Sequence, residues 1–222
     1  MLSLKLSAPL IGLFSAGLLC LGLYGMSVES APFLSTAGTV ADRLQSVAAD
    51  PDVPFLSSKR ALGVFDLDCR RLAFDQTAET IPFEDRPRLN DACYERAKSM
   101  VAAAPGNAIL WLTLARFAAT DADRRDTTFR ALELSRAYGP WQYALATDRM
   151  QLIALIPDTP PAIKAIVDAD IATLAASYRG REDLAKLYIA MPDRRDQITA
   201  AIEKRPAGQQ NQFLSRIRRN MQ

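Results

Sequence analysis

The sequence predicts an all-α protein, with an apolar helix near its amino terminus and antiparallel helical hairpins after it. Of the 222 residues, 49% are hydrophobic and only 10 are glycine. Apolar residues recur at helical spacing from residue 55 onward, and strand-like alternation is nearly absent. A chain of this length holds one compact domain and an appendage. We therefore expect a transmembrane anchor or signal over residues 1–31, a linker with a short helix over 32–54, and a helical domain over 55–222.

The first predicted element is a membrane helix. Residues 6–28 carry no charge, and at about 1.5 Å per residue they span roughly 34 Å, enough for a bilayer core of about 30 Å. A cleaved secretory signal is the alternative, because Lys5 supplies a basic start and Val28-Glu29-Ser30 before Ala31 is a tolerable cleavage site. The length of the apolar stretch favours an uncleaved anchor. Either way we expect export, and the anchor predicts a single-pass inner-membrane protein whose carboxy-terminal domain lies in the periplasm.

A stripe of small residues runs along this helix. Ala8, Gly12, Ala16 and Cys20 recur every four residues, so a second membrane helix can approach closely there. This pattern favours contact with an integral membrane protein of an envelope assembly. Gly and Ala are also common in membrane helices and signals generally, so ordinary composition stays an alternative.

Helices with regular breaks are expected after the anchor. A helix over 39–49 should end at residues 50–54, where two prolines interrupt it. Apolar spacing predicts one helix from Ala61 to Leu72 and another from Leu89 to Val101, and Asn107 is placed to cap the next. Because the loops are short, neighbouring helices should run antiparallel. The later helices are expected over 110–118, 127–138, 141–156, 161–178, 183–190, 194–204 and 209–219.

Residues 104–115 resemble a tetratricopeptide repeat. In that family a proline closes one repeat, and a Trp, a Leu and a small residue follow at set offsets. Pro105, Trp111, Leu114 and Ala115 occupy those offsets in this chain. The resemblance therefore implies a short solenoid of helical hairpins, with at least about three stacked units.

The resemblance also implies roles for particular residues. Gly139-Pro140 closes the unit about 34 residues after Pro105, which matches the repeat length. Ala115 and Ala131 should lie where two helices touch, and Trp111 should fill the space between repeats. Thr127 departs from the family pattern, which usually has Ala at that position.

An apolar helix followed by a small repeat domain is also similar to the plan of small envelope proteins of alphaproteobacteria that accompany exopolysaccharide or O-antigen polymerases. This resemblance implies an accessory role. We therefore predict a non-catalytic adaptor or scaffold of the cell envelope, accessory to surface polysaccharide polymerisation or export.

The sequence offers little for catalysis. It contains no histidine, which excludes Ser-His-Asp and Cys-His catalysis and His-ligated zinc. It also lacks a Walker loop, a dinucleotide-binding glycine pattern and a Gly-x-Ser-x-Gly elbow. We predict no catalytic residue, metal or cofactor. A soluble periplasmic enzyme that acts on glycans through a carboxylate pair is the alternative function, because separation in space defines such a pair.

Three Asp-x-Asp sequences begin at Asp66, Asp121 and Asp168. Residues i and i+2 of a helix point to different faces, so the first and third pairs should not chelate one ion. We expect all three pairs on solvated faces.

Two cysteines lie outside the apolar stretch. Cys69 and Cys93 fall on consecutive predicted helices, separated by the turn around residues 82–87. An exported domain lies in an oxidising compartment, so we predict a disulfide between them. Two small buried thiols are the alternative.

The aromatic residues Trp111, Trp141, Tyr138 and Tyr143 gather around one repeat junction. They could line a ligand groove, but aromatic residues at helical spacing more often belong to a core. We favour the core interpretation here.

Charge is distributed unevenly along the chain. The total of +2 favours no nucleic-acid partner, whereas residues 179–222 carry an excess of +5. The last predicted helix has an apolar face of Phe213, Leu214 and Ile217, which a cap on the helical stack would bury. Its arginines could instead contact an anionic glycan, phospholipid or acidic protein surface. The residues predicted for that contact are Arg216, Arg218 and Arg219.

Overall fold

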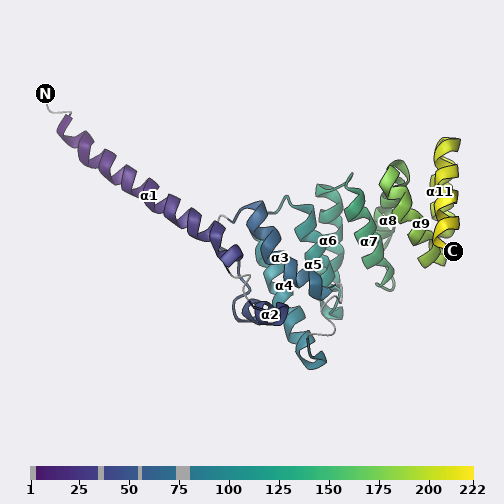
Figure 1. Ribbon diagram of the computed structural model, residues 1–222, viewed down its shortest axis with the longest axis horizontal. Coiled ribbons are helices and arrows are strands. Elements are labelled where there is room, and N and C mark those ends of the chain that lie inside the picture. Colours follow the sequence, from purple (N-terminus) through teal and green to yellow (C-terminus); the bar gives the residue numbers. More distant parts are fainter. Residues whose placement is uncertain (1–3, 35–37, 55–56, 74–80) are drawn as a thin grey trace. The chain divides into compact units, whose positions relative to one another are not determined.

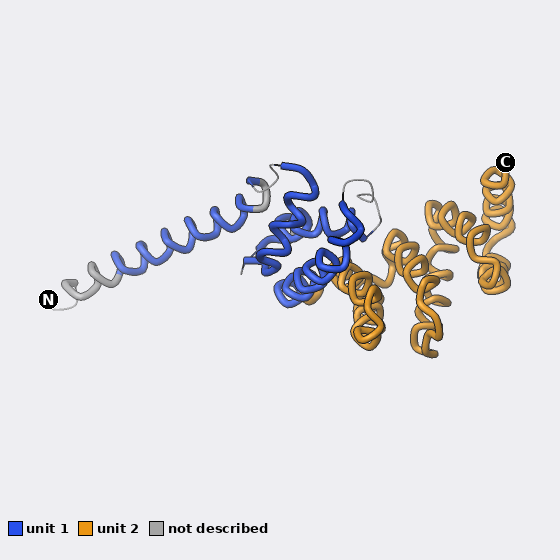
Figure 2. The backbone as a smooth tube through the Cα atoms, turned by 90° about the horizontal axis from the view of Figure 1, so that it is seen from below, with its two compact units in different colours: residues 1–104 blue, residues 105–222 orange. Residues whose placement is uncertain are grey.

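The computed structural model describes residues 4–34, 38–54, 57–73 and 81–222, and the fold over these ranges is all-α (Figure 1). Short 3-10 turns at Phe83–Asp85, Ala122–Arg124 and Pro192–Arg194 lead into α4, α6 and α10. The chain divides into two compact units, unit 1 (Met1–Ala104) and unit 2 (Pro105–Gln222) (Figure 2). The helices are α1 Leu4–Leu34, α2 Val40–Ala49, α3 Lys59–Ala73, α4 Arg86–Ala103, α5 Ala108–Ala118, α6 Arg125–Tyr138, α7 Tyr143–Ala154, α8 Pro161–Ala176, α9 Tyr178–Ala190, α10 Arg195–Glu203 and α11 Ala207–Asn220.

In unit 1 the short helix α2 packs against α4 and α3. Its start is a capping box: the Thr39 hydroxyl accepts from the Asp42 N–H at 3.2 Å, and the Asp42 carboxylate accepts from the Thr39 N–H at 2.9 Å. The Thr39 hydroxyl also donates to the Asp42 carboxylate at 2.8 Å, and the bonds from the Thr39 N–H and hydroxyl, the N–H one above all, hold the pKa of Asp42 below its ordinary value. Leu44 and Val47 are buried on the opposite face. The helix predicted over 39–49 is therefore confirmed.

A disulfide joins α3 to α4. The Cys69 and Cys93 sulfur atoms are 2.06 Å apart, and their Cα atoms are 5.6 Å apart. Both residues are fully buried. The predicted bridge is confirmed, and it cross-links the two longest helices that follow α1 in unit 1.

In unit 2 helices pack on their chain neighbours, α5 on α6, α7 on α8 and α8 on α9, and then on the helix two positions away, α10 on α8 and α11 on α9. Asn107 caps α5 as predicted, because its side chain accepts from the Ile109 N–H at 3.2 Å. The helices turn their apolar sides toward one another. The core of the unit includes Leu110, Leu114, Phe117, Leu132, Leu145, Ile163, Ile171, Leu174, Leu184, Ile198 and Phe213.

One predicted boundary in unit 2 is wrong. The sequence suggested a helix over 161–178 and the next from 183, but α8 ends at Ala176 and α9 begins at Tyr178. Ser177 separates them, and its hydroxyl accepts from the Gly180 N–H at 3.1 Å to cap α9. A Cβ on Gly180 would lie 2.6 Å from the Leu174 carbonyl oxygen, so glycine permits this close turn.

The residues predicted to pack the repeat lie in the α5–α6 pair. Leu114, Ala115 and Ala131 are buried. Trp111 is half-buried, and its indole N–H donates to the Pro105 carbonyl at 2.6 Å. Leu114, Ala115 and Ala131 thus belong to the core of the unit, while Trp111 is bound to the loop before its own helix. The stacked repeats that the resemblance implies stay a prediction.

Candidate functional sites

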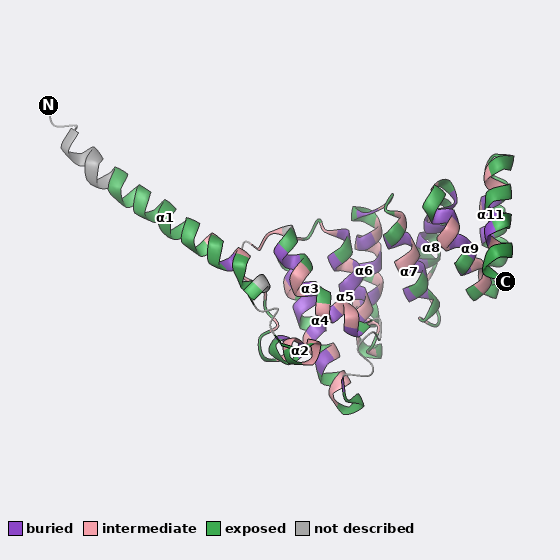
Figure 3. Ribbon diagram, viewed as in Figure 1, coloured by how far each residue is buried: buried purple, intermediate pink, exposed green. Residues whose placement is uncertain are grey.

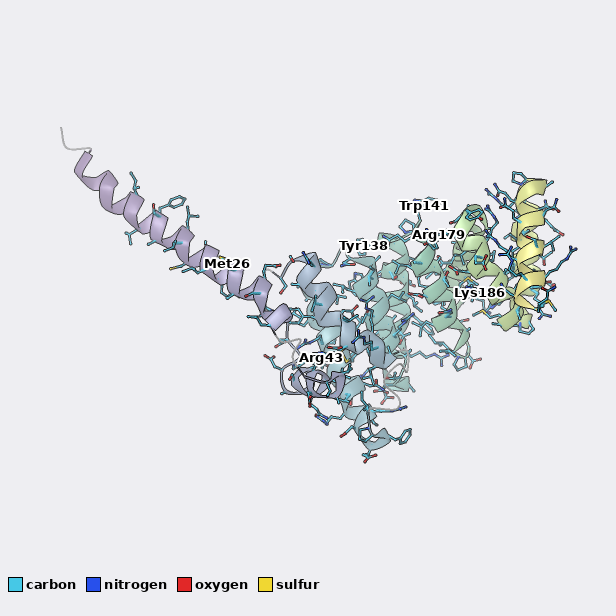
Figure 4. The ribbon with its side chains drawn as sticks, in the orientation of Figure 1. Met26, Arg43, Tyr138, Trp141, Arg179 and Lys186 are labelled. Atoms are coloured by element: carbon cyan, nitrogen blue, oxygen red, sulfur yellow. A yellow bond between two sulfur atoms is a disulfide. The ribbon has the colours of Figure 1, made fainter. Side chains whose placement is uncertain are left out.

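Helix α1 exposes its large apolar side chains from Ile11 to Met26, the part of its length with described side chains that precedes Val28 (Figure 3). The segment Ile11–Ala31 has a mean hydropathy of 1.8 and is long and apolar enough to cross a membrane. Large apolar side chains that would contact lipid include Phe14, Leu19 and Met26, the last labelled in Figure 4. The structure thus contains the N-terminal apolar helix that the sequence predicted, suited to an anchor or a signal.

The predicted small-residue stripe lies on this exposed helix. Gly12, Ala16 and Cys20 are exposed, and nothing lies within 4 Å of a Cβ placed on Gly12. The Ala8 side chain falls outside the described residues. Contact between this stripe and another membrane helix stays a prediction.

The carboxy-terminal end of α1 is folded against α3. Val28 is 5% exposed, whereas the residues on the preceding turns are exposed. The Glu29 carboxylate accepts from the Ser58 N–H and from the Ser58 hydroxyl, both at 2.7 Å. The Ser58 hydroxyl oxygen in turn accepts from the Ala61 N–H at 3.2 Å, so Glu29 and Ser58 together cap the start of α3. Sequence reasoning saw residues 28–30 only as a cleavage site and missed this junction.

The segment after α2 is fastened to α4. Arg96 is buried, and its guanidinium donates to the Pro51 carbonyl at 3.1 Å and to the Asp50 carbonyl at 2.6 Å. Burial lowers the pKa of Arg96, and the nearby acidic groups Asp50 and Asp52 oppose that change. The Val53 N–H donates to the Ser99 hydroxyl at 3.0 Å. The predicted linker is therefore bound to unit 1 at its carboxy-terminal end.

A buried ion cluster joins three helices of unit 2. Arg149 and Asp170 are both fully buried and form two hydrogen bonds, at 2.7 and 2.8 Å. Arg136 donates to the same carboxylate at 3.0 Å. Burial raises the pKa of Asp170, and the two guanidinium groups oppose the rise. The cluster ties α8 to α7 and α6, and its side chains are committed to packing.

In the first Asp-x-Asp sequence, and also in the third, the two carboxylates do not share a site. Asp66 pairs with Arg70 at 2.6 Å, while Asp68 pairs with Arg43 at 2.7 Å. Asp170 joins the buried cluster, and Asp168 is exposed. The expectation of solvated faces is wrong for Asp66 and Asp170, which are buried because arginines on their own or neighbouring helices neutralise them. Within the described ranges no group of three or more Cys, Asp or Glu residues is placed to hold a metal.

A polar groove of about 490 Å³ lies among the amino-terminal ends of α7 and α9 and one face of α11. We call it the terminal groove. Its lining includes Tyr143, Tyr178, Arg179, Glu182, Arg216 and Arg219.

Arg216 forms a fixed part of the terminal groove. It is 6% exposed, donates to the Tyr178 carbonyl at 2.6 Å and pairs with Glu182 at 3.2 Å. Its guanidinium also lies 4.4 Å from the centre of the Tyr178 ring. Arg216 is therefore used inside the unit, and its predicted contact with an anionic partner stays a prediction. Arg218 and Arg219 are exposed, so their contact with a partner stays a prediction.

The apolar face predicted for α11 is only partly used. Phe213 is buried and packs edge-on against Tyr188, with ring centres 5.8 Å apart. Ile217 is half-buried, but Leu214 is exposed. The buried apolar face of α11 is therefore narrower than the predicted one, because a single neighbouring helix, α9, supplies most of the surface on which α11 packs.

The aromatic residues around the α6–α7 turn do not form a core. Trp141 is 82% exposed and Tyr138 is exposed, and both project outward in Figure 4. Trp111 and Tyr143 are half-buried. The core interpretation therefore fails for the two residues nearest the turn, and only Tyr143 lines the terminal groove.

No protein-family model matches this sequence. Neither the curated proteins nor the solved structures include a match. The contacts described above are therefore the basis for the function proposed next.

Proposed function

We propose that this chain is a membrane-anchored, non-catalytic adaptor of the cell envelope. The junction between α1 and α3 carries the proposal. Val28 is buried and Glu29 makes two hydrogen bonds with Ser58, so cleavage after Ser30 would remove part of the folded unit. A domain that needs the end of α1 for its own folding keeps the anchor and stays beside integral membrane proteins.

The disulfide supports the side of the membrane on which the domain lies. Disulfides persist in oxidising compartments such as the bacterial periplasm. The N-terminal apolar helix and the Cys69–Cys93 bridge are together consistent with an envelope location. We propose that α1 crosses the inner membrane once and that residues after it lie in the periplasm.

The chemistry of unit 2 favours binding over catalysis. The two acidic side chains of the terminal groove are engaged, Glu182 with Arg216 and Asp183 with the Thr147 hydroxyl. The tetratricopeptide-like pair α5–α6 is of a kind that presents helix faces to partners. On the resemblance to envelope proteins described above, we propose that the partner belongs to an assembly that polymerises or exports surface polysaccharide.

The anchor can be tested by the mass of the mature protein. Full-length protein isolated from carbonate-washed membranes should retain Met1 or begin at Leu2. A Glu29→Ala variant should lower the thermal stability, whereas Ser30→Ala, whose hydroxyl bonds only to the Ser27 carbonyl, should not. A mature amino terminus near residue 31 in a soluble fraction would contradict the proposal and favour a periplasmic enzyme.

The adaptor role can be tested by affinity purification from detergent-solubilised membranes. We expect recovery of an integral membrane protein of a polysaccharide assembly. Replacing Gly12 and Ala16 by Leu should reduce this recovery, whereas Gly17→Leu, on another face of α1, should not. Recovery of no membrane protein would contradict the adaptor role, and equal recovery with all variants would show that the stripe is ordinary composition.

A further inference from the structure

The terminal groove presents both hydrogen-bond donors and acceptors. Arg179, Arg219 and Gln212 supply donors, and Glu182 and Asp183 supply carboxylate acceptors. Ser215 adds a hydroxyl oxygen that can accept, because its proton is donated to the Gln212 carbonyl at 2.8 Å. Because the lining contains both donors and acceptors, a ligand that fits the groove must itself both accept and donate hydrogen bonds.

Positive charge exceeds negative charge in the groove. Three guanidinium groups face two carboxylates, and Arg216 is already paired with Glu182. Neither Arg179 nor Arg219 has an ion-pair partner among the described residues, and the neighbouring Tyr143 hydroxyl raises the pKa of Arg179. Two cations are therefore available to a bound anion.

An exposed aromatic ring borders these charges. Tyr178 is 66% exposed, and Arg216 covers one part of its ring while holding its backbone carbonyl. Exposed tyrosine rings combine a flat apolar surface with a polar tip. Such a surface suits the C–H face of a sugar ring, whose hydroxyl groups then reach the polar lining.

Buried hydrogen bonds join the helices that line the groove. Arg181 is buried and donates to the Ala175 carbonyl at 3.0 Å and to the side chain of the lining residue Gln212 at 3.1 Å. Burial lowers the pKa of Arg181, and the positive charges of Arg216 and Arg205 lower it further. These contacts join α8, α9 and α11, so the groove exists before any ligand binds.

We propose that the terminal groove binds an acidic saccharide, a sugar chain that carries carboxylate groups. Sugar hydroxyls satisfy the mixed donors and acceptors, Tyr178 packs on a sugar ring, and Arg179 and Arg219 pair with carboxylates. An acidic peptide fits less well, because its backbone carries no ring hydroxyl groups to meet the mixed lining and no C–H sugar face to pack on Tyr178. This inference deepens the adaptor role and rests on it only for the export of the domain.

The test uses full-length protein in nanodiscs of phosphatidylcholine, titrated by calorimetry with trigalacturonate and with short alginate oligosaccharides. Arg219→Gln should weaken binding about tenfold, because one charge-assisted hydrogen bond is lost. Tyr178→Ala should weaken it by a similar factor. The matched control is Arg218→Gln, which makes the same charge change at the next residue of α11, outside the groove, and should alter affinity less than about twofold.

Three further probes separate the ligand classes: maltotriose as a neutral saccharide, tetraglutamate as an acidic peptide and glycerol-1-phosphate as a lipid headgroup. We expect each to bind at least about tenfold more weakly than the acidic saccharides. The proposal is overturned if any of the three binds as tightly, if none of the acidic saccharides binds, or if Arg218→Gln and Arg219→Gln weaken binding equally. Because no membrane partner is present, failure here would leave the recovery experiment for the adaptor role unaffected.

Discussion

In unit 1 a disulfide joins α3 to α4, whereas in unit 2 the buried carboxylate of Asp170 on α8 joins Arg149 on α7 and Arg136 on α6. The disulfide and the ion cluster both connect neighbouring helices through the interior of their units. The first is covalent and depends on the redox state of the compartment. The second is electrostatic and depends on geometry, because each buried charge must meet its partner.

The difference shows how the two units depend on their surroundings. Unit 1 contains both cysteines that follow the apolar stretch, and its helix α1 is joined to the start of α3 through Glu29 and Ser58. Unit 2 contains no cysteine, so its fold does not depend on oxidation. It also contains Trp111 and Trp141, the two tryptophans of the chain, so tryptophan fluorescence reports on unit 2 alone.

The largest expected effect comes from Asp170→Ala. Removing this carboxylate leaves Arg149 buried without its charge partner, which should lower the unfolding free energy by about 3–5 kcal/mol. Urea unfolding followed by tryptophan fluorescence measures the change. The matched control replaces both Arg149 by Met and Asp170 by Leu, and it should cost much less. Equal losses for the single and double variants would show that lost packing, not an orphaned charge, causes the effect.

The next effect is expected from replacing both Cys69 and Cys93 by Ala. Without the cross-link the unfolded chain has more conformational entropy, so the unfolding free energy of unit 1 should fall by about 3 kcal/mol. Circular dichroism follows the whole chain, while tryptophan fluorescence should show an unchanged transition for unit 2. A matching shift in the fluorescence transition would break the comparison, since it would mean that the units unfold together.

A smaller effect in unit 1 is expected from Arg96→Met. The carbonyls of Asp50 and Pro51 would lose the buried guanidinium that donates to both, at a cost of about 2 kcal/mol to stability. Lys98→Met is the control, since Lys98 pairs with Glu95 on the exposed side of the same helix and should change stability by less than about 0.5 kcal/mol. Thermal unfolding monitored by circular dichroism compares them, and similar shifts would contradict a special role for Arg96.

The smallest expected effects come from two glycine substitutions, which should have opposite signs. Gly180→Ala in unit 2 places a Cβ 2.6 Å from the Leu174 carbonyl oxygen and should destabilise by about 1 kcal/mol or more. Gly63→Ala in α3 of unit 1 meets nothing within 4 Å and should stabilise by about 0.5–1 kcal/mol. The midpoints of thermal unfolding measure both. A stabilising Gly180→Ala would show that the α8–α9 turn is looser than described.

Local patterns were enough to predict much of the fold. Periodic apolar residues predicted the helices, Asn107 predicted the cap of α5, and two cysteines on successive helices predicted the bridge. These features depend on residues close in sequence or on a compartment, so the sequence contains the needed information. The candidate site was less predictable. Arg216 appeared as a free surface charge, yet Tyr178 and Glu182 enclose it.

The sequence by itself determined the apolar helix, the all-α class and the disulfide pair, because spacing and composition fix which faces of helices are apolar. Only the tertiary structure decided which charges are buried. Asp170 meets Arg149 and Arg136 from two other helices, and Glu29 meets Ser58 across a separation of 29 residues. A charged side chain enters a core only when a distant partner compensates its lost hydration, and one-dimensional spacing does not show which partner the packing brings near.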